Sequence, residues 1–156
     1  MKKKIMVFTV LMAMLFLFTA CGQKNVQANL LDTLATMEEK LTLPDGLQDI
    51  TASDLERLYG ISSEQYVQFA GKISTVGILG DEIVMIEAGD EDAAASVKEK
   101  MEARYQSRLN EMDGYLPDEY FKISNGGVYQ KGNYVALLVN EEQDALVEIF
   151  EGSFND

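Results

Sequence analysis

YVALLV at residues 134–139 and EIVMIEA at residues 82–88 are the stretches of sequence that decide the fold. Each is a short apolar run of the length of a β-strand, in which successive side chains point to opposite faces of a sheet. In both runs the apolar residues fall on both faces. Since a strand of this kind is buried on both sides, both faces of the predicted sheet need a cover.

Two further segments are predicted to be strands. Residues 67–74 alternate with a period of two and leave one face in water. Residues 120–129 precede a tight turn at residues 131–133 and are expected to include a strand. Two alternatives remain for this segment: a pair of short strands divided at Asn125, Gly126 and Gly127, or a helical turn over residues 117–120.

The spacing of apolar residues also predicts helices. They cover residues 30–41, 53–60, 90–112 and 144–150, with one further turn at residues 62–66. Thr51 or Ser53 begins the second helix, and Ser53 with Glu56 has the spacing of a capping box. Asp90, Glu91 and Asp92 place negative charge at the start of the longest helix, where it complements the helix dipole.

This order of elements predicts an α+β fold with a four-stranded, mostly antiparallel sheet in the order ββαββα, preceded by N-terminal helices. We expect the long and C-terminal helices on one face and the N-terminal helical segment on the other, in a two-layer or helix-covered sandwich. The alternative is an open apolar face that binds a partner, which charged substitutions at Val84 or Val135 would probe. Residues 30–156 form the single predicted domain.

The N-terminus has the features of a secretory signal. Three lysines precede an apolar run over residues 5–18, which is short for a membrane span. Thr19, Ala20 and Cys21 follow, and this block resembles a bacterial lipoprotein signal. The resemblance implies a signal peptide over residues 1–20, acylation of Cys21, a tether over residues 21–29, and a place on the outer face of the bacterial cell membrane.

Composition excludes several kinds of chemistry. The 156 residues carry a formal net charge of −13 and include no His, no Trp and a single Cys. His-based catalysis, His-ligated metals and internal disulfides are therefore excluded. The acidic balance also argues against nucleic-acid binding, which needs a basic footprint on the protein.

The remaining routes to catalysis lack a specific motif. Ser74 with Lys72, or Ser124 with Lys122, could form a Ser–Lys dyad, but no nucleophile elbow accompanies them. A pair of carboxylates could hydrolyse glycosidic bonds. The candidates for such a pair are Glu87, Asp118, Glu119 and Asp144. Because carboxylates are abundant, no residue is assigned as catalytic.

No cofactor or metal is assigned either. Residues 89–92 form the best acidic cluster for calcium, but they lack the spacing of an EF-hand loop, and helix capping explains them. Gly126 and Gly127 are interpreted as a loop or bulge, since the Lys-Ser/Thr of a P-loop does not follow them.

Several short motifs together resemble a known family. They are LYGI at residues 58–61, YLPD at residues 115–118 and KGNYV at residues 131–135, behind the lipoprotein signal. With these motifs the chain resembles a family of small lipoproteins from Gram-positive bacteria, known only as a domain of unknown function. The resemblance covers residues 43–150. It implies a cellular location and a single-domain organisation, and it supplies no catalytic residue, cofactor or substrate.

The sequence therefore predicts a membrane-anchored extracytoplasmic lipoprotein that acts as a non-catalytic binding or interaction module. The expected partners are the membrane, through lipid on Cys21, and an envelope protein or cell-wall component, with no nucleic acid. The alternative is a carboxylate-dependent hydrolase or small-ligand binder that acts on cell-envelope material.

Overall fold

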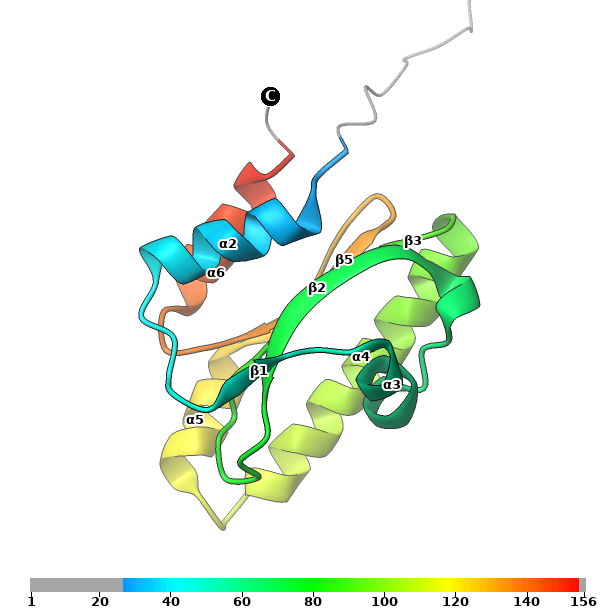
Figure 1. Cartoon of the computed structure of the whole chain (residues 1–156). Coiled ribbons are helices and arrows are strands. Elements are labelled where there is room, and N and C mark those ends of the chain that lie inside the picture. The colour runs from blue at the N-terminus through cyan, green and yellow to red at the C-terminus, as the bar shows by residue number, and fades with distance from the viewer. Residues whose placement is uncertain (1–26, 155–156) are drawn as a thin grey trace, which may run out of the picture.

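The computed structural model describes residues 27–154 of the chain (Figure 1). The predicted signal peptide over residues 1–20 and the lipidation of Cys21 lie outside the described residues. Within residues 27–154, every helix is too short or too polar to cross a membrane.

Five strands form one antiparallel sheet with the order β1-β2-β3-β5-β4. The strands are β1 (Leu47–Asp49), β2 (Tyr66–Ser74), β3 (Glu82–Ala88), β4 (Gly127–Lys131) and β5 (Tyr134–Val139). Every residue of β5 is buried, and Glu87 is the only residue of β3 that is not. The two runs that decide the fold are therefore inner strands, and the expectation that both of their faces are covered is confirmed.

The sheet has one strand more than the four that the sequence predicts. The additional strand is β1, which pairs at the sheet edge with the end of β2, where Leu47 lies opposite Ser74. Its three residues are too few to show a period of two, so the sequence carries no strand signal there.

Helices cover the sheet on both faces, which makes three layers (Figure 1). They are α2 (Leu30–Lys40), α3 (Ala52–Asp54), the π-helix η1 (Leu55–Tyr59), the 3-10 helix η2 (Ser63–Gln65), α4 (Glu91–Met112), α5 (Pro117–Asn125) and α6 (Gln143–Gly152). One core lies between the sheet and α4, α5 and η1. The second core lies between the sheet and the pair α2 and α6.

The position of α6 corrects the expectation that it shares a face with the long helix. Leu146 and Phe150 of α6 are buried in the same core as Leu30 and Met37 of α2. A helix of 22 residues such as α4 is about 33 Å long, whereas the 11 residues of α2 span only about 16 Å. The face that α2 begins to cover therefore needs a second helix, and no open apolar face remains at Val84 or Val135, which are fully buried.

The expectation that residues 120–129 include a strand is confirmed only for residues 127–129, and the alternative of a helical turn over residues 117–120 proves to be the start of a longer helix. Residues 117–125 form α5, and β4 begins only at Gly127. Pro117 opens the helix, acidic residues occupy its first turn and Lys122 its last, which suits the helix dipole. A Cβ at Gly126 would lie 2.7 Å from the carbonyl oxygen of Leu138, so only glycine allows the chain to pass β5 this closely.

Two leucines of α2 offer a matched test of the second layer. Leu34 is 6% exposed in the core between α2 and the sheet, whereas Leu31 is 66% exposed on the same helix. We expect Leu34→Ala to lower the free energy of unfolding by about 2–5 kcal/mol, because it leaves a cavity. Leu31→Ala should stay within about 0.5 kcal/mol of the parent in urea denaturation. Equal effects of the two substitutions would contradict the placement of α2.

Candidate functional site

Two neighbouring carboxylates are buried at the start of β3. Asp81 and Glu82 are 2% and 4% exposed, and they bond to different groups. Asp81 contacts α5 and the end of β5, while Glu82 contacts η1 and α4. Because a buried carboxylate needs charged or hydrogen-bonding partners, this end of the sheet collects the polar side chains of several elements.

Glu82 is held by a tyrosine and an arginine. The Tyr59 hydroxyl donates to Oε1 of Glu82, and Arg104 donates from Nε at 3.1 Å to Oε1 and from Nη2 at 3.2 Å to Oε2. The Arg104 guanidinium also lies 5.7 Å from the centre of the Tyr59 ring, within the range of a cation–π contact. Burial, and then the Glu82 carboxylate, raise the pKa of Tyr59 well above its usual range, so its hydroxyl keeps the proton that it donates.

An unusual helix brings Tyr59 to this position. Thr51 and Asp54 form a capping box that starts α3, so the box expected from Ser53 and Glu56 is replaced by one that begins at Thr51. The chain continues as the π-helix η1, which Gly60 ends in the left-handed conformation with φ 68°. π-helical turns are rare in proteins, and a large share of those that occur lie at functional sites.

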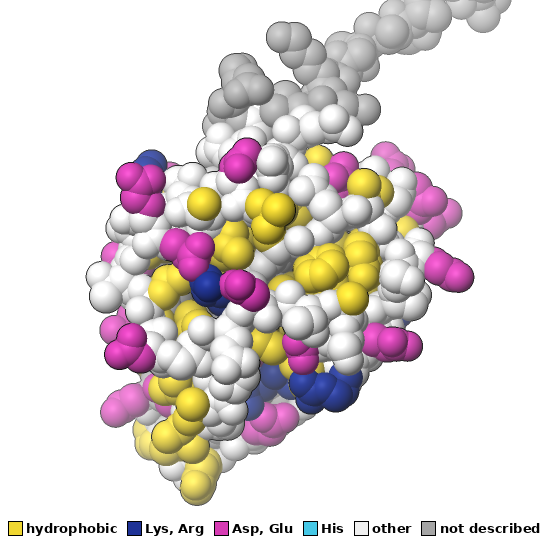
Figure 2. Space-filling view, in the orientation of Figure 1, with side chains coloured by type: hydrophobic (Ala, Val, Ile, Leu, Met, Phe, Trp, Pro, Cys, Tyr) yellow, Lys and Arg dark blue, Asp and Glu magenta, His cyan; other side chains and the backbone are white. Residues whose placement is uncertain are grey.

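A cavity beside this cluster gathers the arginines of the chain. It has a volume of about 300 Å³ and lies among β1, the end of β2, the β2–β3 loop, η1 and α4. Arg57, Arg104 and Arg108, which are all the arginines in the sequence, line it. Figure 2 shows basic side chains gathered on the face where α3 and α4 lie in Figure 1. We call this hollow the arginine cavity.

Arg108 is only partly satisfied. Its Nη1 lies 2.6 Å from Glu111 Oε2, and its Nη2 donates to the carbonyl of Leu79 at 2.8 Å. The buried Nε has no hydrogen-bond partner within the described residues, and Glu82 Oε2 lies 4.0 Å away. Arg108, which lines the arginine cavity, therefore has one buried donor without a partner among the described residues.

Asp81 belongs to a second cluster, on α5. Lys122 Nζ donates to Asp81 Oδ2 at 2.8 Å, and Asn140 Nδ2 donates to Oδ1 at 2.8 Å. Lys122 also pairs with Glu119 at 3.1 Å, and Glu119 accepts the backbone N–H of Gly80 at 2.6 Å. These bonds fasten the β2–β3 loop to α5.

The carboxylates predicted as hydrolase candidates are partly brought together. Asp118, Glu119 and Asp144 line one hollow of about 550 Å³ between α5 and the start of α6. Glu87 lies elsewhere, on β3, where its Oε2 accepts from Gln68 at 2.6 Å. The hollow is acidic, but the Glu119 carboxylate is already bonded to Lys122 and to the backbone N–H of Gly80.

Neither of the two conceivable Ser–Lys dyads forms. Lys72 pairs with Asp49 at 2.7 Å and with Glu38 at 2.8 Å, while the Ser74 hydroxyl bonds to the backbone of Val76. Lys122 is engaged as described above, and the Ser124 hydroxyl donates to the carbonyl of Phe121.

The acidic cluster at residues 89–92 has a structural role. Asp90 accepts the backbone N–H of Ala93 at 2.8 Å and caps α4, as the capping interpretation expects. Among residues 27–154, no group of three or more acidic side chains is arranged to hold a metal ion.

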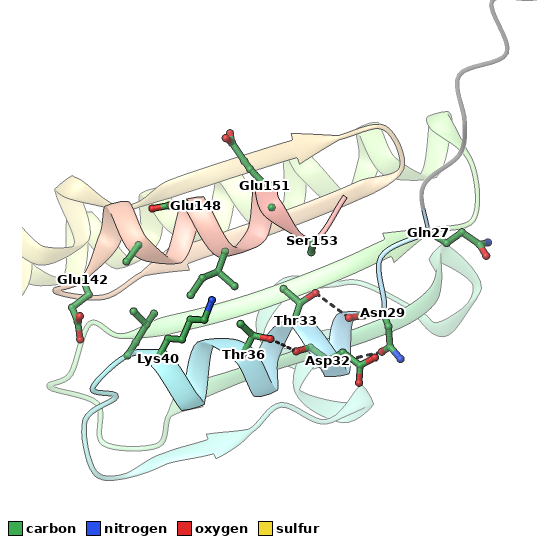
Figure 3. Close-up of a pocket in the computed structure, with 14 residues that line it drawn as sticks. Gln27, Asn29, Asp32, Thr33, Thr36, Lys40, Glu142, Glu148, Glu151 and Ser153 are labelled. Atoms are coloured by element: carbon green, nitrogen blue, oxygen red, sulfur yellow. Dashed lines mark hydrogen bonds between the residues drawn. The ribbon is translucent and has the colours of Figure 1, made fainter. Parts of the chain in front are cut away.

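A groove of about 1010 Å³ lies between α2 and α6 (Figure 3). On its α2 side, Thr33 and Thr36 donate to the carbonyls of Asn29 and Asp32, both at 2.9 Å. Glu151 on α6 points away from the groove in Figure 3. Because these hydroxyls donate to their own helix, they have no hydrogen left to donate to a ligand in the groove.

The sequence did not single out the arginine cavity, although it contains a signal for it. The predicted long helix carries Arg104 and Arg108 four residues apart, hence on one face. Charged residues normally face water, so sequence reasoning places Arg104 on the outer face of that helix. The buried partner Glu82, which draws both arginines inward, is recognisable only once β3 is placed against α4.

Tyr59 and Tyr66 provide a test of the buried cluster. Tyr59→Phe removes a donor from the buried Glu82 carboxylate, so we expect a loss of about 1.5–3 kcal/mol in the free energy of unfolding. Tyr66→Phe is the matched control, since the Tyr66 hydroxyl makes no hydrogen bond within the described residues. Urea denaturation at pH 7 measures both, and a Tyr59→Phe variant as stable as Tyr66→Phe would show that the Tyr59–Glu82 bond contributes nothing.

The raised pKa of Tyr59 predicts a dependence of stability on alkaline pH. Above about pH 10, a tyrosine of the unfolded chain loses its proton while Tyr59 in the folded protein keeps its own. The folded state then binds more protons, so the free energy of unfolding falls as the pH rises. In denaturation curves between pH 9 and pH 11, the fall should be smaller in Tyr59→Phe, by up to about 1.4 kcal/mol per pH unit. Identical pH profiles would contradict this assignment.

Comparison with known proteins identifies the family. Residues 39–140 match the family described as Domain of unknown function (DUF4358), and this region contains Asp81, Glu82 and the three arginines. No curated protein and no solved structure matches the chain significantly. The match spans well over half of the chain, from the end of α2 to the residue after β5, and the protein therefore belongs to this family of domains of unknown function.

Proposed function

We propose that the protein is an extracytoplasmic lipoprotein, anchored to the bacterial cell membrane through Cys21, that acts without catalysis as an interaction module for a protein of the cell envelope. The observation that carries this proposal is an exposed apolar end of the domain. We call it the apolar end, and it consists of Val76, Ile78, Tyr115, Tyr120 and Phe121.

The apolar end gathers most of the large exposed hydrophobic side chains. Among the described residues there are seven of these, and five lie on the β2–β3 loop, the α4–α5 turn and α5. Tyr115 and Phe121 are 71% and 67% exposed. The bond from Gly80 to Glu119 holds the loop and the helix together. Figure 2 shows hydrophobic side chains gathered at the lower left, where α5 lies. Apolar patches of this kind on a soluble domain commonly bind another protein.

The position of the apolar end supports a partner rather than the membrane. The described chain begins at Gln27 beside the start of α2, and its C-terminal end lies at the same end of the molecule (Figure 1). The β2–β3 loop and α5 occupy the opposite end. A tether that leads from Cys21 to α2 would hold the domain with its apolar end directed away from the lipid.

The strength of the proposed anchor follows from its chemistry. Two acyl chains on Cys21 are sufficient for stable membrane attachment, at about 0.8 kcal/mol per buried methylene, whereas one chain is marginal. The acidic charge of the domain, −13 over the whole chain, opposes a flat association with anionic lipid. The lipid then supplies the attachment and leaves the domain free to meet a partner.

The acidic hollow beside α5 favours a second candidate function. Asp118, Glu119 and Asp144 share a concavity of about 550 Å³ next to the exposed ring of Phe121. A carboxylate-dependent hydrolase or a small-ligand binder acting on envelope material would use such a hollow. This second function requires the carboxylates, whereas docking at the apolar end requires the aromatic side chains.

Photo-crosslinking in cells separates the two candidates. A photoreactive residue at position 121 should give a discrete crosslinked protein, and the same residue at position 31, which is also exposed, should not. Tyr120→Ser should weaken that crosslink strongly, because exposed aromatic anchors dominate the binding energy of interfaces. Asp118→Asn with Asp144→Asn should leave it unchanged. Loss of the crosslink in the carboxylate variant alone would favour the second candidate.

Substitution of Cys21 tests the anchor. Cys21→Ser removes the only thiol of the chain, so the protein should move from the membrane fraction to the medium, while Leu31→Ser should stay with the membrane. Fractionation followed by immunoblotting measures this. A Cys21→Ser protein that remains in the membrane fraction would contradict lipid anchoring.

A further inference from the structure

We propose that the arginine cavity is a binding site for a carboxylate group, carried either by a small free acid or by the C-terminus of a peptide. This site is separate from the apolar end, and the proposal does not depend on the function proposed above. It rests on the geometry of Arg104, on the two other arginines, and on the size and charge of the cavity.

Arg104 is held ready for a second carboxylate. A guanidinium group has two edges that can each donate two parallel hydrogen bonds. The edge formed by Nε and Nη2 is occupied by Glu82. Nη1 makes no hydrogen bond within the described residues, and the side chain, 19% exposed, lines the cavity. Glu82 and the Tyr59 ring thus fix the guanidinium while its outer edge stays free.

Arg57 and Arg108 line the same cavity and supply further positive charge. The Arg57 side chain is 64% exposed at the rim, where Nη2 donates to Asp54 at 2.8 Å and leaves its other nitrogens in solvent. A long side chain in this position can close over a ligand without a change in the backbone. Arg108 lines the wall with Nη1 bonded to Glu111 and Nη2 bonded to the Leu79 carbonyl, so it contributes its positive charge.

The gathering of all three arginines is unusual in this chain. Acidic residues outnumber basic ones 26 to 13, so an arbitrary hollow on its surface is expected to be acidic. The hollow beside α5 meets that expectation, with Asp118, Glu119, Glu141 and Asp144 against the single Lys122. The arginine cavity differs in its share of basic groups, because three arginines line it together with four carboxylates.

The surroundings favour a singly charged, planar anion over phosphate. Asp49, Asp54, Asp81 and Glu82 also line the cavity, so a doubly charged anion would meet repulsion from several sides. Lys72 pairs with Asp49 and Lys122 pairs with Asp81, and these pairs reduce the repulsion that a singly charged ligand would meet. A volume of about 300 Å³ is at the lower end for ligand sites, which suits a small acid or the last residues of a peptide.

Calorimetric titration of the full chain, purified in detergent, tests the proposal with four probes. They are N-acetyl-alanyl-alanine, the same dipeptide with a C-terminal amide, propionate and inorganic phosphate. The dipeptide acid should bind at least about tenfold more tightly than its amide, because the amide lacks the charge that the guanidinium groups recognise. If propionate binds as tightly as the dipeptide acid, the ligand is a small free acid; if it binds more weakly, the ligand is a peptide C-terminus.

Variants of the cavity complete the test. Arg57→Gln changes an exposed side chain and should weaken binding of the dipeptide acid by about tenfold with the fold intact. Arg104→Gln is combined with Glu82→Gln, so that no unpaired charge is left buried, and should abolish binding. Lys98→Gln, on α4 but outside the cavity, is the control and should bind as the parent does.

Three results would overturn the proposal. The first is equal binding of the acid and the amide, or no binding of either at millimolar concentration. The second is tighter binding of phosphate than of propionate. The third is unchanged binding in both the Arg57→Gln protein and the folded Arg104→Gln, Glu82→Gln protein.

Discussion

The constraint on which the structure depends is that two adjacent strands, β3 and β5, are apolar on both faces. A sheet with such strands is stable in water only when both of its faces are covered. The long helix α4 covers one face, and the two shorter helices α2 and α6 together cover the other. The three layers, and the return of the C-terminal helix to the N-terminal one, follow from this requirement.

The same arrangement concentrates the polar chemistry at one end of the sheet. Asp81 and Glu82 lie at the start of β3, where the apolar layers end and α5, η1 and the second half of α4 meet. Burying two carboxylates contributes little to stability on its own, because desolvation offsets the gain from ion pairing. The carboxylates do position other groups: Glu82 orients Arg104 towards the arginine cavity, and Asp81 orients Lys122 beside the acidic hollow. The apolar end lies on the same side of the domain, so the arginine cavity, the acidic hollow and the apolar end are close together.

Patterns within a single element allowed much of the fold to be predicted. Residues 82–88 and 134–139 show their strands directly, and Asp90 marks the start of α4. Features that depend on contacts between distant segments could not be predicted. The tight turn at residues 131–133 predicts a strand before it, but Pro117 and the burial of Ile123 against α4 favour a helix over residues 117–125. β1 exists only because the end of β2 offers it a partner.

For the candidate sites too, single residues could be named from the sequence, whereas the contacts between distant segments could not. Asp118, Glu119 and Asp144 could be named from the sequence as candidates, since the acidic residues are visible there, but their common hollow depends on α5. The importance of Arg104 depends on Glu82, which lies 22 residues away and shows in the sequence only as a charge at the edge of an apolar run. A buried charge of this kind becomes recognisable when its partners are placed around it.

The central claim is that the Glu82–Arg104 pair is present to position a binding group and not to stabilise the fold. The most direct measurement compares the parent with a triple variant, Tyr59→Phe, Glu82→Met and Arg104→Met, in urea denaturation. Replacing a whole buried ion pair by apolar side chains of similar size is often neutral or stabilising. We predict a free energy of unfolding within about 1 kcal/mol of the parent or above it, together with complete loss of carboxylate binding. A loss of about 3 kcal/mol or more, the magnitude expected when a buried charge loses its partner, would contradict the claim.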